Sequence, residues 1–150
     1  MNPLKTLSLS SAIGIYILIV VGGITTQSGS GMACPDWPLC FGELLPNFTT
    51  SVLIEMTHRY LAMVVGFLIL GTFIVAYRSY RDNTSLVTTS GITLVLVTIQ
   101  AYIGMLTVTS ILDPAIVTIH LAVSTALFGF SIITALISVS YTHLTLPTKA

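Results

Sequence analysis

Ionisable side chains at the start of a long apolar stretch, SVLIEMTHRYLAMVVGFLILGTF, are the residues of this sequence best suited to chemistry. Glu55, His58 and Arg59 lie close together there. An ionisable side chain inside a bilayer costs about 2.5–3.5 kcal/mol on insertion scales, so its presence favours a functional role. Glu55 and His58 are spaced i, i+3 and therefore share one face of a helix.

A second imidazole is expected at matching depth in another helix. Ser51 is an N-cap residue type, and a helix that starts after it has His58 as its seventh residue. Asp113 followed by Pro114 predicts another helix start, with His120 again the seventh residue. At a rise of about 1.5 Å per residue, both imidazoles lie about 10 Å below their helix starts. A facing pair of this kind suggests axial ligation of a haem iron inside a four-helix bundle.

Structural roles stay open for the same side chains. An intramembrane histidine is often a hydrogen-bond partner between helices, and Glu55 and Arg59 could simply pair with each other near the membrane interface. Gln100 is expected to be a polar contact between helices and not a ligand. Zinc or a non-haem metal would need more ligands than the apolar stretches offer. Several glycines are expected to allow close helix approach or room for a ligand: Gly22, Gly23, Gly66, Gly71 and Gly104.

The elements that must position these residues are membrane helices. The 150 residues are 54% hydrophobic and 7% charged, whereas a soluble domain carries about a quarter charged residues. Net charge is zero and no basic stretch offers a nucleic-acid surface. We therefore expect an all-α integral membrane protein whose residues 1–140 form one four-helix transmembrane bundle. The apolar runs predict spans at about 8–25, 52–77, 86–109 and 114–140.

Basic residues predict the orientation in a cell membrane. Lys5 precedes the first span, and Arg78 and Arg81 lie between the second and third, so both termini are expected in the cytoplasm. The first span is interpreted as retained, because no cleavage site typical of a signal peptide follows it. Residues 141–150, which include His143, are expected to be a polar tail without a role, foreign to the native protein.

The 26–51 segment is the one sizeable loop between spans, and it holds both cysteines of the chain. On the outer face the surroundings are oxidising, so a disulfide between Cys34 and Cys40 is predicted. Two free thiols or a metal-binding pair are the alternatives. A thiol-exchange role is typical of C-x-x-C spacing, which is absent here.

Three stretches together resemble the haem A synthase family. They are GGITTQSGSGMACPDWPLCFG at 22–42, EMTHRYLA at 55–62 and the histidine early in the fourth span, and the resemblance covers roughly residues 10–140. It implies an oxidoreductase that converts the C8 methyl of haem O to a formyl group, which yields haem A for the haem-copper terminal oxidases. Members are usually eight-span proteins made of two similar four-span halves, and the match is to the N-terminal half.

The resemblance also implies roles for individual residues. His58 and His120 would be the axial ligands of the substrate haem, and Glu55 the catalytic carboxylate. Cys34 and Cys40 match the outer-loop cysteine pair of one branch of the family. Separately, a guanidinium binds carboxylates bidentately, so Arg59 is expected to hold a haem propionate.

Two features depart from the family pattern. The second half, with its histidine pair and its haem b, has no counterpart in these 150 residues, so the chain is expected to be a piece of a longer protein or a half-size form. Thr26 and Gln27 are neutral where many members carry a basic residue.

The expected partners are haem O, the lipid bilayer, haem O synthase, and a second half or a second copy of the chain.

Two other functions compete with this interpretation. A b-type haem module that passes electrons would need the two histidines but neither Glu55 nor the cysteines. A membrane thiol-disulfide oxidoreductase would use Cys34 and Cys40 and bind no haem. Two axial imidazoles on one iron also leave no position for dioxygen, so either one histidine leaves or the oxidation proceeds without oxygen on this iron.

Overall fold

Four long helices make up most of residues 2–144, the part of the chain that the computed structural model describes. They are α1 (Pro3–Gln27), α2 (Thr50–Ser79), α3 (Thr84–Thr109) and α4 (Pro114–Leu144), and a short 3-10 helix, η1 (Ser30–Met32), follows α1. Each of the four is long and apolar enough to cross a membrane. The predicted all-α membrane bundle is confirmed, and the chain is a multi-pass membrane protein.

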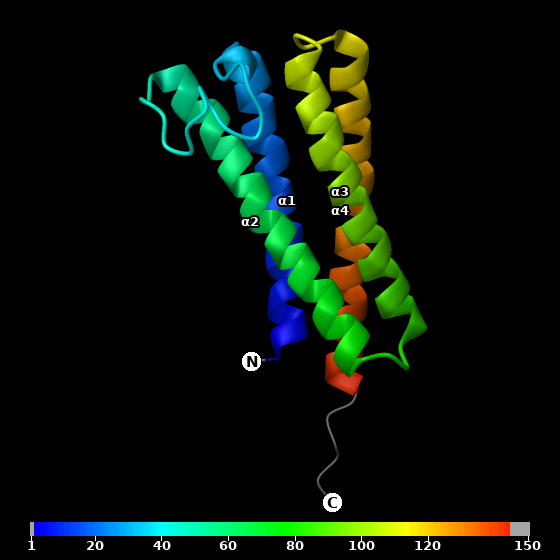
Figure 1. Cartoon of the computed structure of the whole chain (residues 1–150). Coiled ribbons are helices and arrows are strands. Elements are labelled where there is room, and N and C mark those ends of the chain that lie inside the picture. The colour runs from blue at the N-terminus through cyan, green and yellow to red at the C-terminus, as the bar shows by residue number, and fades with distance from the viewer. Residues whose placement is uncertain (1, 145–150) are drawn as a thin grey trace, which may run out of the picture.

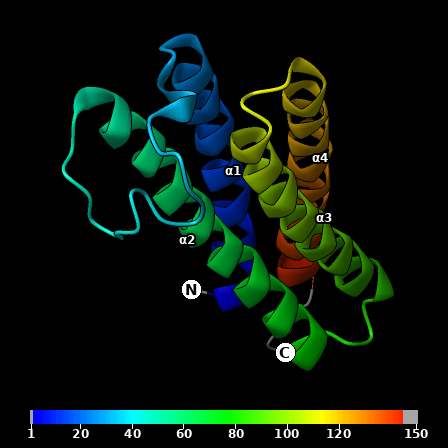
Figure 2. The ribbon, with the colours of Figure 1, turned by 45° about the horizontal axis from the view of Figure 1, so that its top comes forward.

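The helices pack as a ring in chain order. Contacts join α1 to α2, α2 to α3, α3 to α4 and α4 back to α1, so α2 and α4 lie diagonally across the bundle. The α1–α2 pair and the α3–α4 pair diverge toward the end of the bundle that carries the 28–49 and 110–113 connections (Figures 1 and 2). We call this the loop end. The first and last described residues lie at the opposite, terminal end, as the predicted topology requires, and the side of the membrane that each end faces stays a prediction.

Helix starts correct one detail of the sequence interpretation. The cap of α2 is Thr49, not Ser51: Thr49 is extended and its side chain accepts from the Val52 N–H. Three consecutive cap-type residues stand at this point, and the earliest one is used. His58 is therefore the ninth residue of α2 and not the seventh. The predicted Asp113 cap is confirmed, because its carboxylate accepts from the N–H of Ala115.

The first span also begins earlier than its apolar run. Asn2 caps α1 through the Leu4 N–H and Pro3 occupies the first turn, so the helix starts at residue 3 and not near 8. The apolar run marks the part of a helix that meets lipid, whereas the cap marks its true start. At the other terminus α4 continues to Leu144, which makes the first residues of the predicted 141–150 tail helical. Residues 145–150 lie outside the described residues.

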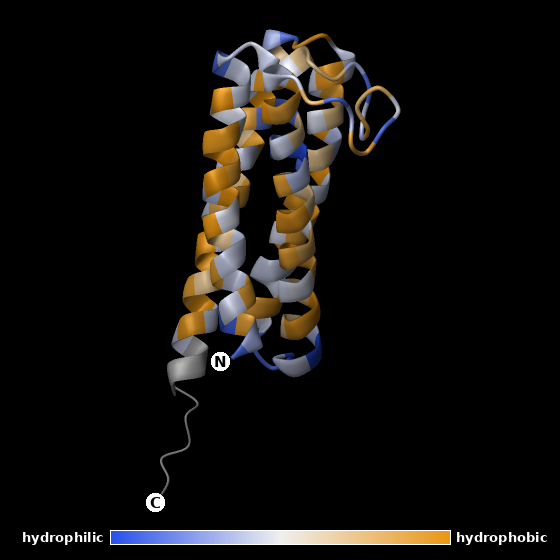
Figure 3. Cartoon of the chain, turned by 90° about the vertical axis from the view of Figure 1, so that its left-hand side faces the viewer, coloured by the Kyte–Doolittle hydropathy of each residue, from blue (hydrophilic) through white to orange (hydrophobic). Residues whose placement is uncertain are grey.

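The interior is layered along the bundle axis. A central apolar cluster contains Ile15, Val65, Ile69 and Leu127. Toward the terminal end comes a layer of buried hydroxyls from all four helices, and Ser138 extends this layer through its contact with Ser8. The other members line a small cavity: Ser8, Ser11, Thr72, Ser90, Thr93, Ser131 and Thr134. Figure 3 shows that hydrophobic residues run along the length of the helices. The central apolar cluster thus separates the hydroxyl layer from the histidines at the loop end.

Candidate functional site

His58 and His120 come from the two diagonal helices and lie in the loop-end half of the bundle. His58 is eight residues past the start of α2, and His120 is six past the start of α4. These offsets correspond to about 12 Å and 9 Å of rise, so the depths are similar although not equal. The structure therefore places both predicted histidines in the same half of the bundle, on helices that lie diagonally across it.

Each imidazole packs against a glycine on a neighbouring helix. A Cβ added to Gly22 of α1 would lie 3.0 Å from Cε1 of His58, and one added to Gly104 of α3 would lie 3.3 Å from Cε1 of His120. These distances are shorter than ordinary van der Waals contact, so a larger residue would push the ring away. Two of the five glycines predicted to permit close approach thus make room for the histidines. Gly71 meets only Leu7, and Gly23 and Gly66 meet nothing within 4 Å.

Three buried polar atoms around this pair have no hydrogen-bond partner: Nδ1 of His58, Nδ1 of His120 and Oε1 of Gln100. Gln100 donates from Nε2 to the His120 carbonyl at 2.9 Å, which confirms the predicted helix–helix contact. Because that carbonyl only accepts, the orientation of the amide is fixed and Oε1 is left free. Buried polar atoms are nearly always satisfied, so unpaired ones in a cluster indicate a place where a ligand or water completes the bonding.

The donor set fits a haem better than a free metal ion. Among the described residues no group of three or more histidine, cysteine, aspartate or glutamate side chains could hold a metal ion. A structural or catalytic zinc site needs at least three such ligands. A porphyrin supplies four nitrogens itself and asks the protein only for axial ligands, which two imidazoles on opposite helices can provide.

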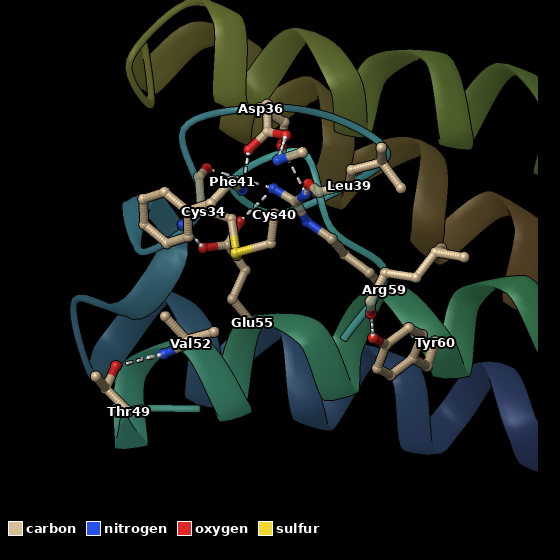
Figure 4. Close-up of a disulfide and its surroundings, with 12 residues drawn as sticks. Cys34, Asp36, Leu39, Cys40, Phe41, Thr49, Val52, Glu55, Arg59 and Tyr60 are labelled. Atoms are coloured by element: carbon tan, nitrogen blue, oxygen red, sulfur yellow. Dashed lines mark hydrogen bonds and ion pairs between the residues drawn. A yellow bond between two sulfur atoms is a disulfide. The ribbon is translucent and has the colours of Figure 1, made fainter. Parts of the chain in front are cut away.

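Glu55 is buried, with 4% of its surface exposed, and both of its carboxylate oxygens are engaged. Oε2 accepts from the Cys34 N–H at 2.8 Å, and Oε1 pairs with Arg59 at 2.5 Å (Figure 4). The pairing of Glu55 with Arg59, which the sequence left open as a structural alternative, is therefore present. It is formed in a buried position under the loop, however, and not at an exposed interface.

Arg59 binds the backbone of the disulfide loop. Its Nη1 donates to the carbonyls of Asp36 and Leu39 at 2.7 and 2.6 Å, and its Nη2 donates to Glu55 and, at 3.5 Å, to the Cys34 carbonyl (Figure 4). The propionate contact expected of Arg59 stays a prediction. A propionate would have to reach Nε or displace one of these acceptors, because both terminal nitrogens already have partners.

The predicted disulfide is present between Cys34 and Cys40, and both residues are fully buried. They form an apolar cluster with Val52 and Met56 at the start of α2. The ring closed by the disulfide therefore packs onto α2 and carries the backbone groups that Glu55 and Arg59 bind. Its burial also disfavours a role in thiol exchange, which needs an accessible sulfur.

A tight turn beside the disulfide is held by Asp36. Phe41 and Gly42 both have positive φ, 54° and 74°, and Cys40 and Glu43 exchange backbone hydrogen bonds across them. The Asp36 carboxylate accepts from the N–H groups of Phe41 and Gly42 at 2.6 and 2.8 Å. These bonds, above all the one from Gly42, hold the pKa of Asp36 below its usual 3.8, and the nearby charge of Arg59 acts in the same direction.

Comparison with known proteins identifies the family of the chain. The family model described as "Cytochrome oxidase assembly protein" matches residues 5–52 and 45–149, which is nearly the whole chain. The chain belongs to the cytochrome oxidase assembly protein family. Relatives in this family are named "Heme A synthase": one from Alkalihalophilus pseudofirmus is 32% identical over 123 residues, which is 81% of this chain and 41% of the relative.

Others come from Bacillus cereus and Bacillus anthracis, each 30% identical over 128 residues, which is 84% of this chain and 41% of the relative. The resemblance to haem A synthases predicted from the sequence is confirmed. The chain spans about two fifths of the length of these relatives.

The sequence did not predict what the loop does for Glu55. The Cys34 N–H and the guanidinium of Arg59 both bind the carboxylate, and Arg59 in turn binds loop carbonyls. The Cys34 N–H and the Glu55 carboxylate are 21 residues apart in the chain, and no periodic pattern in the sequence links them. Only the three-dimensional path of the loop brings the groups together.

Proposed function

We propose that this chain forms the substrate-binding half of a haem A synthase, in which the C8 methyl of haem O is oxidised to a formyl group. The observation that supports this most is the pair of half-buried imidazoles on diagonal helices, each packed against a glycine and each with a buried, unpaired Nδ1. It occurs in a membrane chain whose relatives are named "Heme A synthase". His58 and His120 would bind the iron of haem O, the substrate, as axial ligands.

Glu55 would act on the substrate from the loop end of the site. It shares a helix face with His58 and is held in one place by the Cys34 N–H and by Arg59. Oxidation of the methyl group releases electrons that an external acceptor must take up; the iron of the bound porphyrin would relay them, and the chain's residues bind and orient the porphyrin. A fixed, buried carboxylate can stabilise positive charge that develops on the reacting carbon or accept a proton from it.

The proposal predicts different defects for ligands and carboxylate. The 150-residue chain would be purified from cells that supply haem O, its haem content read from the Soret band and its product separated by chromatography. His58→Ala and His120→Ala should each lower haem content about tenfold or more, because a lost ligand costs more than a lost outer contact. Glu55→Gln should keep the haem and lower formation of the formyl product about 100-fold or more.

Glu43→Gln is the matched control, since Glu43 is an exposed loop carboxylate. It should leave both haem content and product unchanged. Haem retained after loss of both histidines would contradict the ligand assignment. Product formed by Glu55→Gln at the wild-type rate would contradict the role of the carboxylate. If the chain binds haem O through both imidazoles but yields no oxidised product, the result would favour the electron-transfer alternative.

A further inference from the structure

The segment from residue 37 to residue 48 exposes a dense set of large apolar side chains outside the four helices. The two leucines at its centre are 68% and 74% exposed. The set consists of Trp37, Phe41, Leu44, Leu45 and Phe48. Apolar exposure of this density within one short segment points to a surface that meets a partner or a membrane.

This segment folds back along α2 instead of projecting away from the bundle. The Tyr60 hydroxyl donates to the Leu44 carbonyl, and Arg59 binds the carbonyls of Asp36 and Leu39. Tyr60 lies ten residues past Thr50, or about 15 Å down the helix axis, and its side chain leans back over only part of that distance. Figures 1 and 2 show the loop hanging beside α2, below the start of the helix.

The length of α2 places this level inside the membrane boundary. Its 30 residues span about 45 Å, whereas the hydrocarbon core is about 30 Å thick. About 15 Å of the helix then lies outside the hydrocarbon core, divided between its two ends. Tyr60 is about 15 Å from the start of α2, so its backbone lies below the outer limit of the hydrocarbon core. Exposed apolar residues of α2 at and below this level, Met63, Val64 and Phe67, must face lipid, and the loop continues that surface.

Part of the loop backbone is hydrogen-bonded, mainly between residues 34 and 43. Cys34 N–H binds Glu55, the N–H groups of Phe41 and Gly42 bind Asp36, and Cys40 and Glu43 bind each other. The carbonyls of Asp36, Leu39 and Leu44 are bound by α2 side chains. Within the described part of the chain, the N–H groups of Leu44, Leu45 and Phe48 have no protein partner, and unpaired backbone groups are costly in hydrocarbon, so the segment suits the hydrated interface and not the bilayer core.

Charge in the loop also fits a neutral, apolar contact. No lysine or arginine occurs between residues 28 and 49. Asp36 turns its carboxylate onto the loop's own N–H groups, which leaves Glu43 as the one solvent-directed charge of the segment. Attraction to anionic headgroups therefore contributes nothing, and burial of apolar area is the driving force.

The geometry points to a membrane anchor: the side chains of residues 37–48 insert into the boundary between headgroups and acyl chains of the leaflet at the loop end. This anchor fixes the disulfide loop against both lipid and α2, and through the Cys34 N–H and Arg59 it fixes Glu55. The inference does not depend on the proposed reaction, because it rests on exposure, depth and charge alone. The aromatic ring of Trp37 suits an interfacial position.

Trp37 is the single tryptophan of the chain and reports the contact directly. The full chain would be reconstituted into phosphatidylcholine vesicles that carry a doxyl quencher at acyl carbon 5 or carbon 12. Trp37 fluorescence should be quenched by both labels, and more strongly from carbon 5. Raising the salt concentration should leave the quenching unchanged. Absence of lipid quenching overturns the inference, whether the indole is then reached by iodide or covered by protein. Stronger quenching from carbon 12 overturns the interfacial depth.

A pair of variants separates insertion from general packing. Leu44→Glu with Leu45→Glu should lower carbon-5 quenching severalfold and raise quenching by iodide. Ile111→Glu is the matched control, because Ile111 is an exposed apolar residue, 78% exposed, in the other connection at the same end. It should leave the quenching of Trp37 unchanged. An equal loss in both variants would overturn the assignment to residues 44 and 45, and the wild-type depth measurement stands independently of either variant.

Discussion

At the scale of single residues, the contact between Gly22 and His58 decides where the imidazole can lie. The ring of His58 occupies the space that a side chain at Gly22 would need. Gly23, one position along, has no atom within 4 Å of an added Cβ. Gly22 therefore makes room for the imidazole of His58, whereas the adjacent Gly23 does not, although both are glycines on α1.

We expect Gly22→Ala to lower haem binding while Gly23→Ala does not. An alanine in a helix interior is ordinarily favoured over glycine by about 0.5–1 kcal/mol, so Gly23→Ala should be neutral or stabilising. In Gly22→Ala the new methyl group, 3.0 Å from Cε1, must displace the ring. Haem titration followed by the Soret band measures the effect, and circular dichroism checks that helix content is unchanged. Equal haem binding by the two variants would show that the ring position does not matter.

At the scale of elements, the 40–43 turn of the disulfide loop is a small unit that the Asp36 carboxylate holds together with the backbone bonds between Cys40 and Glu43. Asp36 is the acceptor for both residues with positive φ, and Phe41 is unfavourable in that conformation without such support. The charge of Asp36 is stabilised by the N–H groups it binds and by Arg59 of α2. The unit is thus sensitive to the ionisation of a single group.

The pH dependence of this turn follows from the depressed pKa of Asp36. A carboxyl whose pKa is lower in the folded state stabilises the fold above its unfolded value and loses that contribution as pH falls through the folded value. The turn should therefore stay intact at pH 4 and above and loosen only below 3.8. Fluorescence of the adjacent Trp37 measures the transition. Asp36→Asn should weaken the turn at neutral pH and abolish the acid transition, and an unchanged acid transition in that variant would assign it to another group.

At the scale of the whole molecule, hydroxyl pairs join α4 to both of its neighbours at the terminal end. Ser8 and Ser138 are 2.6 Å apart between α1 and α4, and Thr93 and Thr134 are 3.4 Å apart between α3 and α4. Association of helices in lipid has no hydrophobic driving force, so such contacts and close packing hold the bundle. The loop end, where the two helix pairs diverge, lacks this layer.

Thr134→Val should destabilise the bundle, whereas Thr125→Val should not. Valine keeps the shape of threonine and removes its hydroxyl. Both threonines bond the carbonyl one turn back in α4, but Thr134 is buried against Thr93 and Thr125 is exposed. The hydroxyls of Thr93 and Thr134 each also donate to a carbonyl of their own helix and their oxygens are 3.4 Å apart, so the loss should stay below the average of about 0.6 kcal/mol for an interhelical hydrogen bond. Unfolding in a mixed detergent–lipid system measures the difference, and equal stability of the two variants would argue against the hydroxyl layer as a stabilising element.

Much of the architecture follows from the order of the residues. Apolar runs predict the spans because a helix that crosses a bilayer needs about twenty consecutive apolar residues. Residue type and spacing also indicate both histidines and the cysteine pair. Helix starts were predicted less well: the Thr49 cap and the start of α1 at Pro3 lie outside the apolar runs. Caps depend on local backbone bonding, and neighbouring cap-type residues compete for it.

By itself, then, the sequence determined a four-span membrane bundle with two imidazoles on helices that start at the same end, because hydrophobic length and residue type are local properties. Only the tertiary structure decided that these rings rest on Gly22 and Gly104, and that the loop lies back along α2. Glu55 and Arg59 reach groups about twenty residues away in the chain. Contacts of that kind leave no periodic trace, because they depend on how a loop without regular structure closes onto the helix that follows it.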